Sequence, residues 1–334
     1  MATKLHYAVL RTKMLLRALV FLILGGILLF FLLQLALSLK ERYFKTPETP
    51  PTVTFGKLPK VTFPKNASEV QFAYTVDTLS GLLPQFPTQT IVYKGVKNTP
   101  GLLDLQKATD KANKAGFTNK PVALSQTKYQ WTTQEGTLSK KLVLNIVDPY
   151  VSLTSNYLSN PEMFSDEKNL SPEEAVTAAK DFFVSLGVFP QDLDEAKTKT
   201  TKKNSFIRVD FFQKPIQDIA IYYNKPGQSL LYAIVAKPSF TPELVEANFS
   251  YLPLSNEAAT YPIKTAKEAL SQLQKGIGYI ASYDGNKTSI PIQNVFLGYY
   301  AADSNQQFLM PIIVFEGQNG FTAYVSAVRN DWIE

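Results

Sequence analysis

The stretch from Ser171 to Gly187, SPEEAVTAAKDFFVSLG, predicts the most clearly marked element of the chain, an amphipathic helix. Ser171 stands at the N-cap position, Pro172 follows at the first helical position, and Glu174 is placed to return a hydrogen bond to the cap. Glycine commonly follows the last turn of a helix, so Gly187 marks the end. The apolar face steps by three, four and three residues through Val176, Ala179, Phe183 and Leu186.

The same helical pattern occurs on both sides of this stretch. Upstream, an equivalent face ends at Gly116 and consists of Leu105, Ala108, Ala112 and Ala115. Downstream, Thr265 and Glu268 form another capping box, and the inner face consists of Ala266, Leu270, Leu273 and Ile277. Each helix precedes segments in which apolar and polar residues alternate, as in antiparallel strands. The sequence therefore predicts an α+β fold of repeated units, each laying one helix across a small antiparallel meander.

The predicted strands are short and are separated by turn residues. They cover residues 70–76, 90–93, 128–133, 142–147, 206–212, 219–223, 230–236, 292–300, 308–315 and 321–328. The strand at 90–93 is expected to pair with that at 70–76, because Ser80-Gly81 between them marks a turn. The three α+β units are expected to span residues 66–160, 161–255 and 256–334.

An almost unbroken apolar run, LLRALVFLILGGILLFFLLQLALSL, occupies residues 15–39. A bilayer core needs roughly 20 apolar residues in helix, so this run predicts a transmembrane helix held in the lipid bilayer. The basic tail, residues 1–14, is expected in the cytoplasm and the body outside, as for a signal anchor of a cell membrane protein. A cleaved signal peptide with a site at Ala36-Leu37-Ser38 is the alternative. The Gly25-Gly26 pair allows close helix approach and hence a homodimer.

The segment from residue 40 to residue 65 is rich in proline and predicts an extended stalk. Proline at this density prevents helix formation and favours polyproline-type chain. Its prolines are Pro47, Pro50, Pro51, Pro59 and Pro64. In the alternative interpretation, Val53-Thr54-Phe55 and Val61-Thr62-Phe63 pack along the first domain as edge segments.

Composition excludes several classes of function. The chain carries a net charge of +6, and residues 1–45 alone account for it, with seven Lys and Arg against Glu41. The basic character therefore belongs to the flanks of the apolar run, which argues against nucleic-acid binding. The sequence contains no Cys and only one His, His6. We therefore expect no metal, no cofactor and no enzyme activity based on a His base or a Cys nucleophile.

Three clusters of side chains are candidates for binding. Tyr222-Tyr223 and Tyr299-Tyr300 each close a predicted strand, so one ring of each pair should face outward, either as a protein-binding platform or in ordinary sheet packing. An acidic cluster lacks the spacing of a calcium loop and predicts a solvated face; it consists of Asp181, Asp192, Asp194 and Glu195. A basic cluster predicts an exposed loop, or a contact with anionic lipid or cell-wall polymer; it consists of Lys197, Lys199, Lys202 and Lys203.

The C-terminal part resembles PepSY-type domains, and in particular the extracytoplasmic regulators related to YycH and YycI. The resemblance covers about residues 165–330 and rests on the helix Ala266–Leu270, followed by Val295-Phe296-Leu297-Gly298-Tyr299-Tyr300 and Leu309-Met310-Pro311-Ile312-Ile313-Val314-Phe315. It implies a single-pass bacterial protein whose external body binds a membrane partner and regulates or scaffolds it, in signalling or proteolysis. Such families have no catalytic residues to carry over. The stalk and the additional first unit depart from the family, and resemblance to uncharacterised membrane-anchored proteins of small-genome bacteria is an equal alternative. A structural component of a cell-envelope assembly is the second function to consider.

Overall fold

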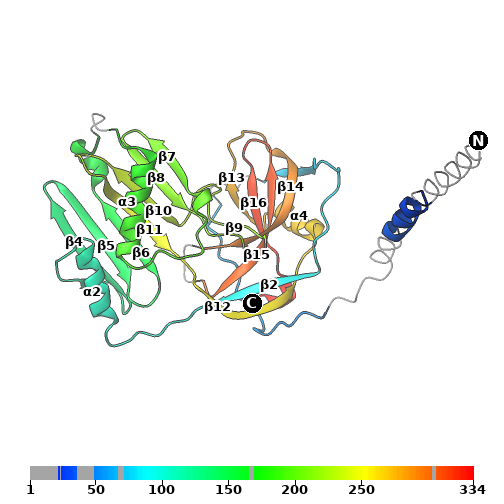
Figure 1. Cartoon of the computed structure of the whole chain (residues 1–334), viewed down its shortest axis with the longest axis horizontal. Coiled ribbons are helices and arrows are strands. Elements are labelled where there is room, and N and C mark those ends of the chain that lie inside the picture. Colours follow the sequence, from blue (N-terminus) through cyan, green and yellow to red (C-terminus); the bar gives the residue numbers. More distant parts are fainter. Residues whose placement is uncertain (1–21, 23, 36–48, 67–70, 165–168, 303–305) are drawn as a thin grey trace, which may run out of the picture. The chain divides into compact units, whose positions relative to one another are not determined.

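The computed structural model describes Leu22 and residues 24–35, 49–66, 71–164, 169–302 and 306–334 (Figure 1). The chain divides into two compact units, Met1–Pro50 and Pro51–Glu334. In the first unit, residues 24–35 are helical and exposed. Across the described residues, no helix combines the length and the apolar character needed to cross a membrane. The predicted span at 15–39 continues beyond the described residues at both ends, so the anchor stays a prediction, as does the cytoplasmic tail.

The second unit confirms the predicted α+β class. Its described residues form three α-helices and two eight-stranded sheets. In the first sheet, here called sheet 1, all pairs are antiparallel and the order is β3-β4-β5-β6-β11-β10-β8-β7. Its strands are β3 (Val122–Ala123), β4 (Lys128–Glu135), β5 (Leu138–Asn145), β6 (Tyr150–Ser155), β7 (Lys199–Lys203), β8 (Phe206–Phe211), β10 (Leu231–Ala236) and β11 (Glu243–Ser250).

Two helices cover one face of sheet 1 (Figure 1). They are α2 (Asp104–Lys114) and α3 (Pro172–Ser185), and their buried residues share one core with the inward side chains of the strands. Each helix precedes four strands of this sheet, and the last strand of each set, β6 and β11, meet at the centre of the sheet. These eight strands therefore form one continuous sheet, whereas the sequence predicts a small sheet for each helix. The predicted strand at 219–223 does not join them, because β9 (Ile221–Tyr222) pairs with β14 (Ser289–Tyr300) of the other sheet.

The capping box of α3 is confirmed. The Ser171 Oγ accepts a hydrogen bond from the Glu174 N–H at 3.1 Å, and a Glu174 side-chain oxygen accepts one from the Ser171 N–H at 2.9 Å. Gly187 follows the helix with φ of 61°, the left-handed conformation that glycine adopts without strain. The inward face is formed by Ala175, Ala179 and Phe183, whereas Val176 lies only partly buried at its border. Val176 also lines the pocket of the candidate site.

The second sheet, here called sheet 2, is mixed. The path β1-β14-β15-β16-β13 forms its centre, β2 and β12 extend it beside β15, and β9 pairs with β14. The helix α4 (Ala266–Gln274) packs on this sheet through Ala266, Ala269 and Leu273. The strands are β1 (Ala73–Val76), β2 (Gln89–Gly95), β9 (Ile221–Tyr222), β12 (Leu254–Pro262), β13 (Tyr279–Ser282), β14 (Ser289–Tyr300), β15 (Phe308–Gly317) and β16 (Thr322–Ser326). Four short 3-10 turns complete the described secondary structure: Tyr157–Ser159, Pro161–Phe164, Glu195–Lys197 and Asn330–Trp332.

The predicted pairing of residues 70–76 with residues 90–93 is wrong. β1 pairs in parallel with β14, in the register Ala73 with Ser289, and β2 pairs with β12 and β15. Both partners lie far along the chain. A local turn signal such as Ser80-Gly81 therefore carries no information about them.

Residues 51–65 of the proline-rich segment pack against sheet 2. Leu58 is fully buried and forms a β-bridge with Ile333. The Phe55 ring stacks on Tyr261 at 6.5 Å between centroids, and the Phe63 ring contacts Tyr300 at 4.9 Å. The interpretation as packed edge segments therefore describes this part of the chain. The surface it covers is sheet 2, to which the first predicted unit contributes Val92 of β2 and the later residues contribute most of the rest. Residues 40–48 of the predicted stalk lie outside the described part of the chain.

A buried lysine lies beneath the start of α4. Lys264 is 5% exposed, and its Nζ donates to the main-chain oxygens of Ser326 and Val328 at 2.8 and 2.6 Å. Burial lowers the pKa of Lys264 to about 8, although nearby Glu268 acts in the opposite direction. The uncharged amine can still donate to both carbonyls. The folded state therefore prefers the neutral lysine.

We predict a pH-dependent contribution of Lys264 to stability. Below pH 8 the folded state keeps a buried charge; as the pH rises from about 8 towards the ordinary value of 10.5, the folded protein releases this proton before the unfolded chain does. The free energy of unfolding should therefore rise with pH in that window. Relative to Lys264→Met, the wild type should gain about 1 kcal/mol between pH 7 and pH 9, below the range in which tyrosines ionise. Urea unfolding at both pH values measures it, and identical pH profiles of the two proteins would contradict the assignment.

Candidate functional site at the edge of sheet 1

The exposed edge of sheet 1 is formed by β7. Among the described strands, β7 pairs only with β8, and four of its residues are exposed: Lys199, Thr201, Lys202 and Lys203. The sequence predicts an exposed loop here, and that prediction is wrong for residues 199–203, which form the strand β7. An edge strand needs no inward apolar residue, and both threonine and lysine are common in such strands. The alternation used to predict the other strands is therefore absent.

The turn after β7 determines which main-chain groups face the open edge. Asn204 and Ser205 connect β7 to β8, and the closing pair is Lys203 with Phe206. A two-residue hairpin turn closes on a hydrogen-bonded pair, and hydrogen-bonded and non-hydrogen-bonded pairs then alternate along the ladder. This alternation directs the N–H and C=O groups of Thr200 and Lys202 away from β8. Among the described residues these groups have no ladder partner on that side, so an added strand could pair with them.

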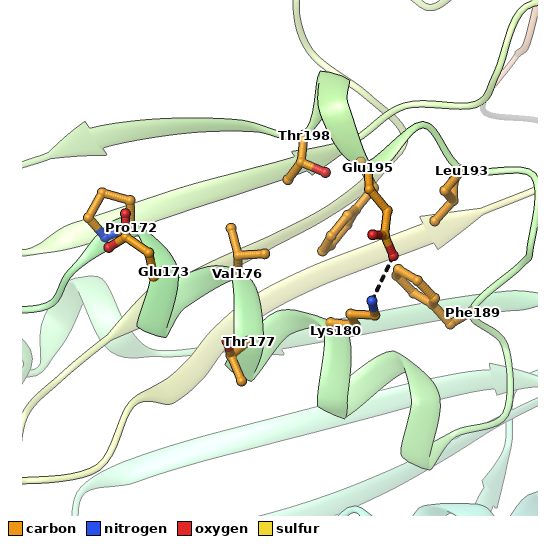
Figure 2. Close-up of a pocket in the computed structure, with 10 residues that line it drawn as sticks. Pro172, Glu173, Val176, Thr177, Lys180, Phe189, Leu193, Glu195 and Thr198 are labelled. Carbon is orange, nitrogen blue, oxygen red and sulfur yellow. Dashed lines mark hydrogen bonds and ion pairs between the residues drawn. The ribbon is translucent and has the colours of Figure 1, made fainter.

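A pocket of about 390 Å³ opens between α3 and the chain that leads into β7 (Figure 2). Thr198, which immediately precedes β7, lies at its border. The apolar part of the lining comes from α3, from the segment that follows it and from β8, and consists of Pro172, Val176, Phe189, Leu193 and Phe211. The polar part consists of Glu173, Thr177, Lys180, Glu195 and Thr198. The pocket thus offers an apolar interior directly beside an open strand edge.

An ion pair borders this pocket. The Lys180 Nζ donates to the Glu195 carboxylate at 2.8 Å and lies 5.6 Å from the centroid of the Phe189 ring (Figure 2). The hydrogen bond from Lys180 holds the pKa of Glu195 below its ordinary value. Both side chains are largely exposed, so the pair contributes little to stability. Its consequence is local, because it neutralises an acidic residue in the segment that leads into β7.

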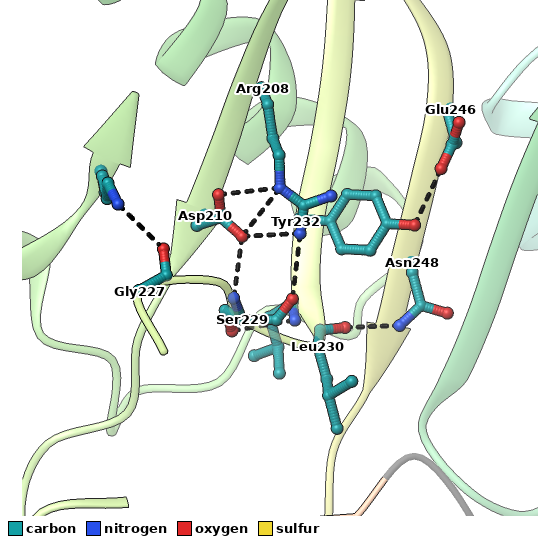
Figure 3. Close-up of polar contacts among 10 residues, drawn as sticks. Arg208, Asp210, Gly227, Ser229, Leu230, Tyr232, Glu246 and Asn248 are labelled. Carbon is teal, nitrogen blue, oxygen red and sulfur yellow. Dashed lines mark hydrogen bonds and ion pairs between the residues drawn. The ribbon is translucent and has the colours of Figure 1, made fainter. Parts of the chain in front are cut away.

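A polar network on the other face of sheet 1 supports this edge (Figure 3). Asp210 of β8 is 1% exposed, and its carboxylate accepts from Arg208 Nε at 2.9 Å, from Arg208 Nη2 at 2.8 Å and from the Ser229 N–H at 2.8 Å. The Arg208 guanidinium stacks on the Tyr232 ring, 3.5 Å from its centroid. The Tyr232 hydroxyl donates to Glu246, and burial raises its pKa to about 12. These contacts tie β8 to β10, β11 and the chain before β10.

The network extends to β7 through a lysine. The Lys199 Nζ donates to the Gly227 carbonyl at 3.1 Å, and Lys199 lies opposite Asp210 in the ladder. Gly227 has φ of 68° and belongs to the turn that leads to Ser229, which Asp210 holds. Asp210 therefore positions both the strand next to β7 and the turn that receives the Lys199 side chain (Figure 3).

The four tyrosines singled out in the sequence do not form an exposed platform. Successive rings point to opposite faces as expected, with Tyr300 opposite Tyr222 in the pairing of β14 with β9. Both faces are covered, however: Tyr299 and Tyr300 are fully buried and Tyr223 is nearly so. Only Tyr222 is half-buried, packed on Phe296 and Tyr324 and against the backbone of Gly298. Burial raises its pKa to about 12. Tyr222 and Tyr300 pack in the aromatic cluster of sheet 2, whereas Tyr223 and Tyr299 belong to the core that α2, α3 and sheet 1 share.

The acidic cluster of the sequence is dispersed among separate partners. Asp194 pairs with Lys197 at 3.6 Å, and Asp192 accepts from Gln213 and from the Tyr251 hydroxyl. Across the ranges that the structure describes, no group of three or more metal-ligating side chains is placed to hold an ion. Asp192, Asp194 and Glu195 therefore support the pocket and the segment before β7, whereas Asp181 is exposed, as predicted for a solvated face.

Comparison with known proteins adds a distant likeness. No protein-family model and no curated protein matches the chain. Among solved structures, the chain is similar to the Bacillus megaterium YpeB C-terminal domain, with 9% sequence identity and a TM-score of 0.32 over 70% of this chain and 100% of that one. This is a weak structural neighbour, and a TM-score this low establishes neither a shared fold nor a shared function.

Proposed function

We propose that this protein is a single-pass, membrane-anchored, extracytoplasmic protein-binding module that regulates or scaffolds a membrane partner. The observation that carries the proposal is the open strand edge of β7 directly beside an apolar pocket. Addition of an extended segment to an exposed sheet edge is a recurring mode of protein recognition. Main-chain hydrogen bonds supply affinity in that mode, and a pocket for a side chain supplies specificity.

The proposed membrane anchor rests on the apolar run at residues 15–39 and on its basic flanks. In this arrangement the body beyond residue 50 lies outside the cell. The order of helix and antiparallel strands, seen once after α2 and again after α3, supports the proposed repeated units of PepSY type.

A structural role in a cell-envelope assembly is the second candidate. It would require copies of this body to associate with each other. At the β7 edge, a second copy would bring lysines next to lysines, because three of the five residues of the strand are Lys199, Lys202 and Lys203. This composition favours a different partner over a second copy.

Site-specific photo-crosslinking in native membranes tests the proposed function. A photoreactive residue at the exposed Thr177, at the pocket border, should give one defined adduct, whereas the same residue at the exposed Asp110 on α2 should give none. Filling the pocket by Val176→Trp should abolish the adduct formed from a photoreactive residue at Lys203. Equal adducts from Thr177 and Asp110, none from either, or only adducts between copies of this chain would refute the proposal.

A further inference from the structure

We infer that the β7 edge takes an extended, acidic segment of the partner, with one apolar side chain inserted into the pocket beside Thr198. This inference rests on the proposed function and specifies its ligand. It combines three independent features of the described structure: outward main-chain groups, an apolar pocket at one end of the strand, and positive charge along the rest.

The positive charge of the edge is not compensated within the described residues. None of Lys199, Lys202 and Lys203 forms an ion pair there; Lys199 donates to the Gly227 carbonyl and Lys202 to the Asn169 side chain. The acidic residues that precede β7 in the chain are already paired, Glu195 with Lys180 and Asp194 with Lys197. Asp210, opposite Lys199 in the ladder, is paired with Arg208. An ammonium group has three donors, so each lysine retains capacity for a carboxylate.

The register of β7 determines how such a segment would lie. Thr200 is opposite Val209 and Lys202 is opposite Ile207, so these side chains share the face that carries α3. Lys199 and Lys203 lie on the other face, opposite Asp210 and Phe206. A segment paired with β7 would therefore place its apolar residue next to Thr198 and the pocket. Its remaining residues would meet a lysine on either face.

The same lysines explain why the open edge does not attract strands indiscriminately. Lysine on an edge strand opposes pairing with neutral or basic strands, since the charge must be brought next to an apolar or like-charged neighbour. A segment that carries carboxylates would instead be attracted to these lysines, so their charge would favour pairing. The edge is thus selective by repulsion of the wrong partner as well as by attraction of the right one.

Peptide binding to the full chain in detergent micelles tests the inference. The probe is a fluorescein-labelled peptide, Phe-Thr-Asp-Val-Glu-Thr-Asp-Val, together with its reversed sequence, because the direction of pairing is open. Fluorescence anisotropy should show binding that weakens as salt is raised. The analogue with lysine in place of each acidic residue should bind at least about tenfold more weakly.

Two matched pairs of variants locate the site. Thr200→Pro removes one outward N–H while leaving the bonds to β8, and it should weaken binding about tenfold, whereas Thr200→Ala should stay within about twofold of wild type. Lys203→Glu should weaken binding about fivefold and reduce its salt dependence, with Lys203→Gln between the two. A peptide N-methylated at alternate amides tests strand addition without any change to the protein, and it should not bind.

Several results would overturn the inference. Equal binding of the acidic and the basic peptide excludes charge selection, and full binding by the N-methylated peptide or by Thr200→Pro excludes strand addition. If those results occur while Thr177 still crosslinks to a defined partner in membranes, the proposed function stands and only the ligand assignment fails. If Thr177 gives no crosslink in membranes, the proposed function itself is refuted.

Discussion

Asp210→Ala should lower the free energy of unfolding by about 3 kcal/mol, the largest effect we expect from a polar residue of this protein. The carboxylate is 1% exposed and holds Arg208 through three hydrogen bonds and the Ser229 N–H through one. Removing it leaves a guanidinium that is 22% exposed without its counter-charge, and a main-chain donor without its acceptor. Urea unfolding of the two proteins measures the loss.

Two control variants separate charge from hydrogen bonding. Asp210→Asn keeps an acceptor for Ser229 but no charge for Arg208, so it should fall between wild type and Asp210→Ala. The pair Arg208→Met with Asp210→Leu removes both charges from the interior and should be less destabilising than Asp210→Ala alone. A double variant whose loss equals the sum of the single losses would show that the two side chains do not act as a pair.

The same substitution should also affect the candidate site. Because Asp210 holds Ser229, and the preceding turn carries the carbonyl that receives Lys199, its loss should loosen the β7 edge. Hydrogen exchange at the amides of β7 is expected to accelerate in Asp210→Ala more than exchange at β4, at the far side of the sheet. Uniform acceleration across sheet 1 would indicate global destabilisation instead.

Local signals in the sequence predicted where α3 and α4 begin, because these ends are specified by neighbouring residues. The inclusion of Ile277 in the inner face of α4 is wrong, since the helix ends at Gln274 and Ile277 is exposed. The capping boxes at Ser171 and Thr265 form as predicted, and both helices begin one residue later. β8 was also predicted, because Ile207, Val209 and Phe211 alternate along one face, although both faces of this strand are buried. What these elements share is that the decisive residues lie within a few positions of one another.

The candidate site could not be predicted, since its decisive features are not local. β7 carries no apolar residue, so its sequence resembles a solvated loop until β8 lies beside it. The pocket combines α3, Phe189, Glu195 and Phe211, which no spacing rule connects. The predicted tyrosine platform is wrong for a different reason. The rings of each pair do point to opposite faces, but a second layer covers the face that a single sheet would expose.

Leu58→Ala should destabilise the protein by about 3 kcal/mol, a result that would not be expected of a residue in a free stalk. Leu58 is fully buried in a cluster with Val92, Tyr261 and Met310 of sheet 2. Its N–H donates to the Trp332 carbonyl at 2.8 Å, and its carbonyl accepts from Glu334 at 2.9 Å. Truncation removes buried apolar area and leaves a cavity between the segment and the sheet, because the main chain stays fixed by these bonds.

The matched control is Lys60→Ala, two residues further along the same segment. Lys60 is exposed, so its truncation should change the free energy of unfolding by less than about 0.5 kcal/mol. A large difference between Leu58→Ala and Lys60→Ala would mean that residues 51–65 unfold together with sheet 2. The proposed anchor would then be coupled to the body by a packed segment, and any force or displacement at the membrane would act first on sheet 2. Equal, negligible effects would instead restore the extended stalk for this part of the chain.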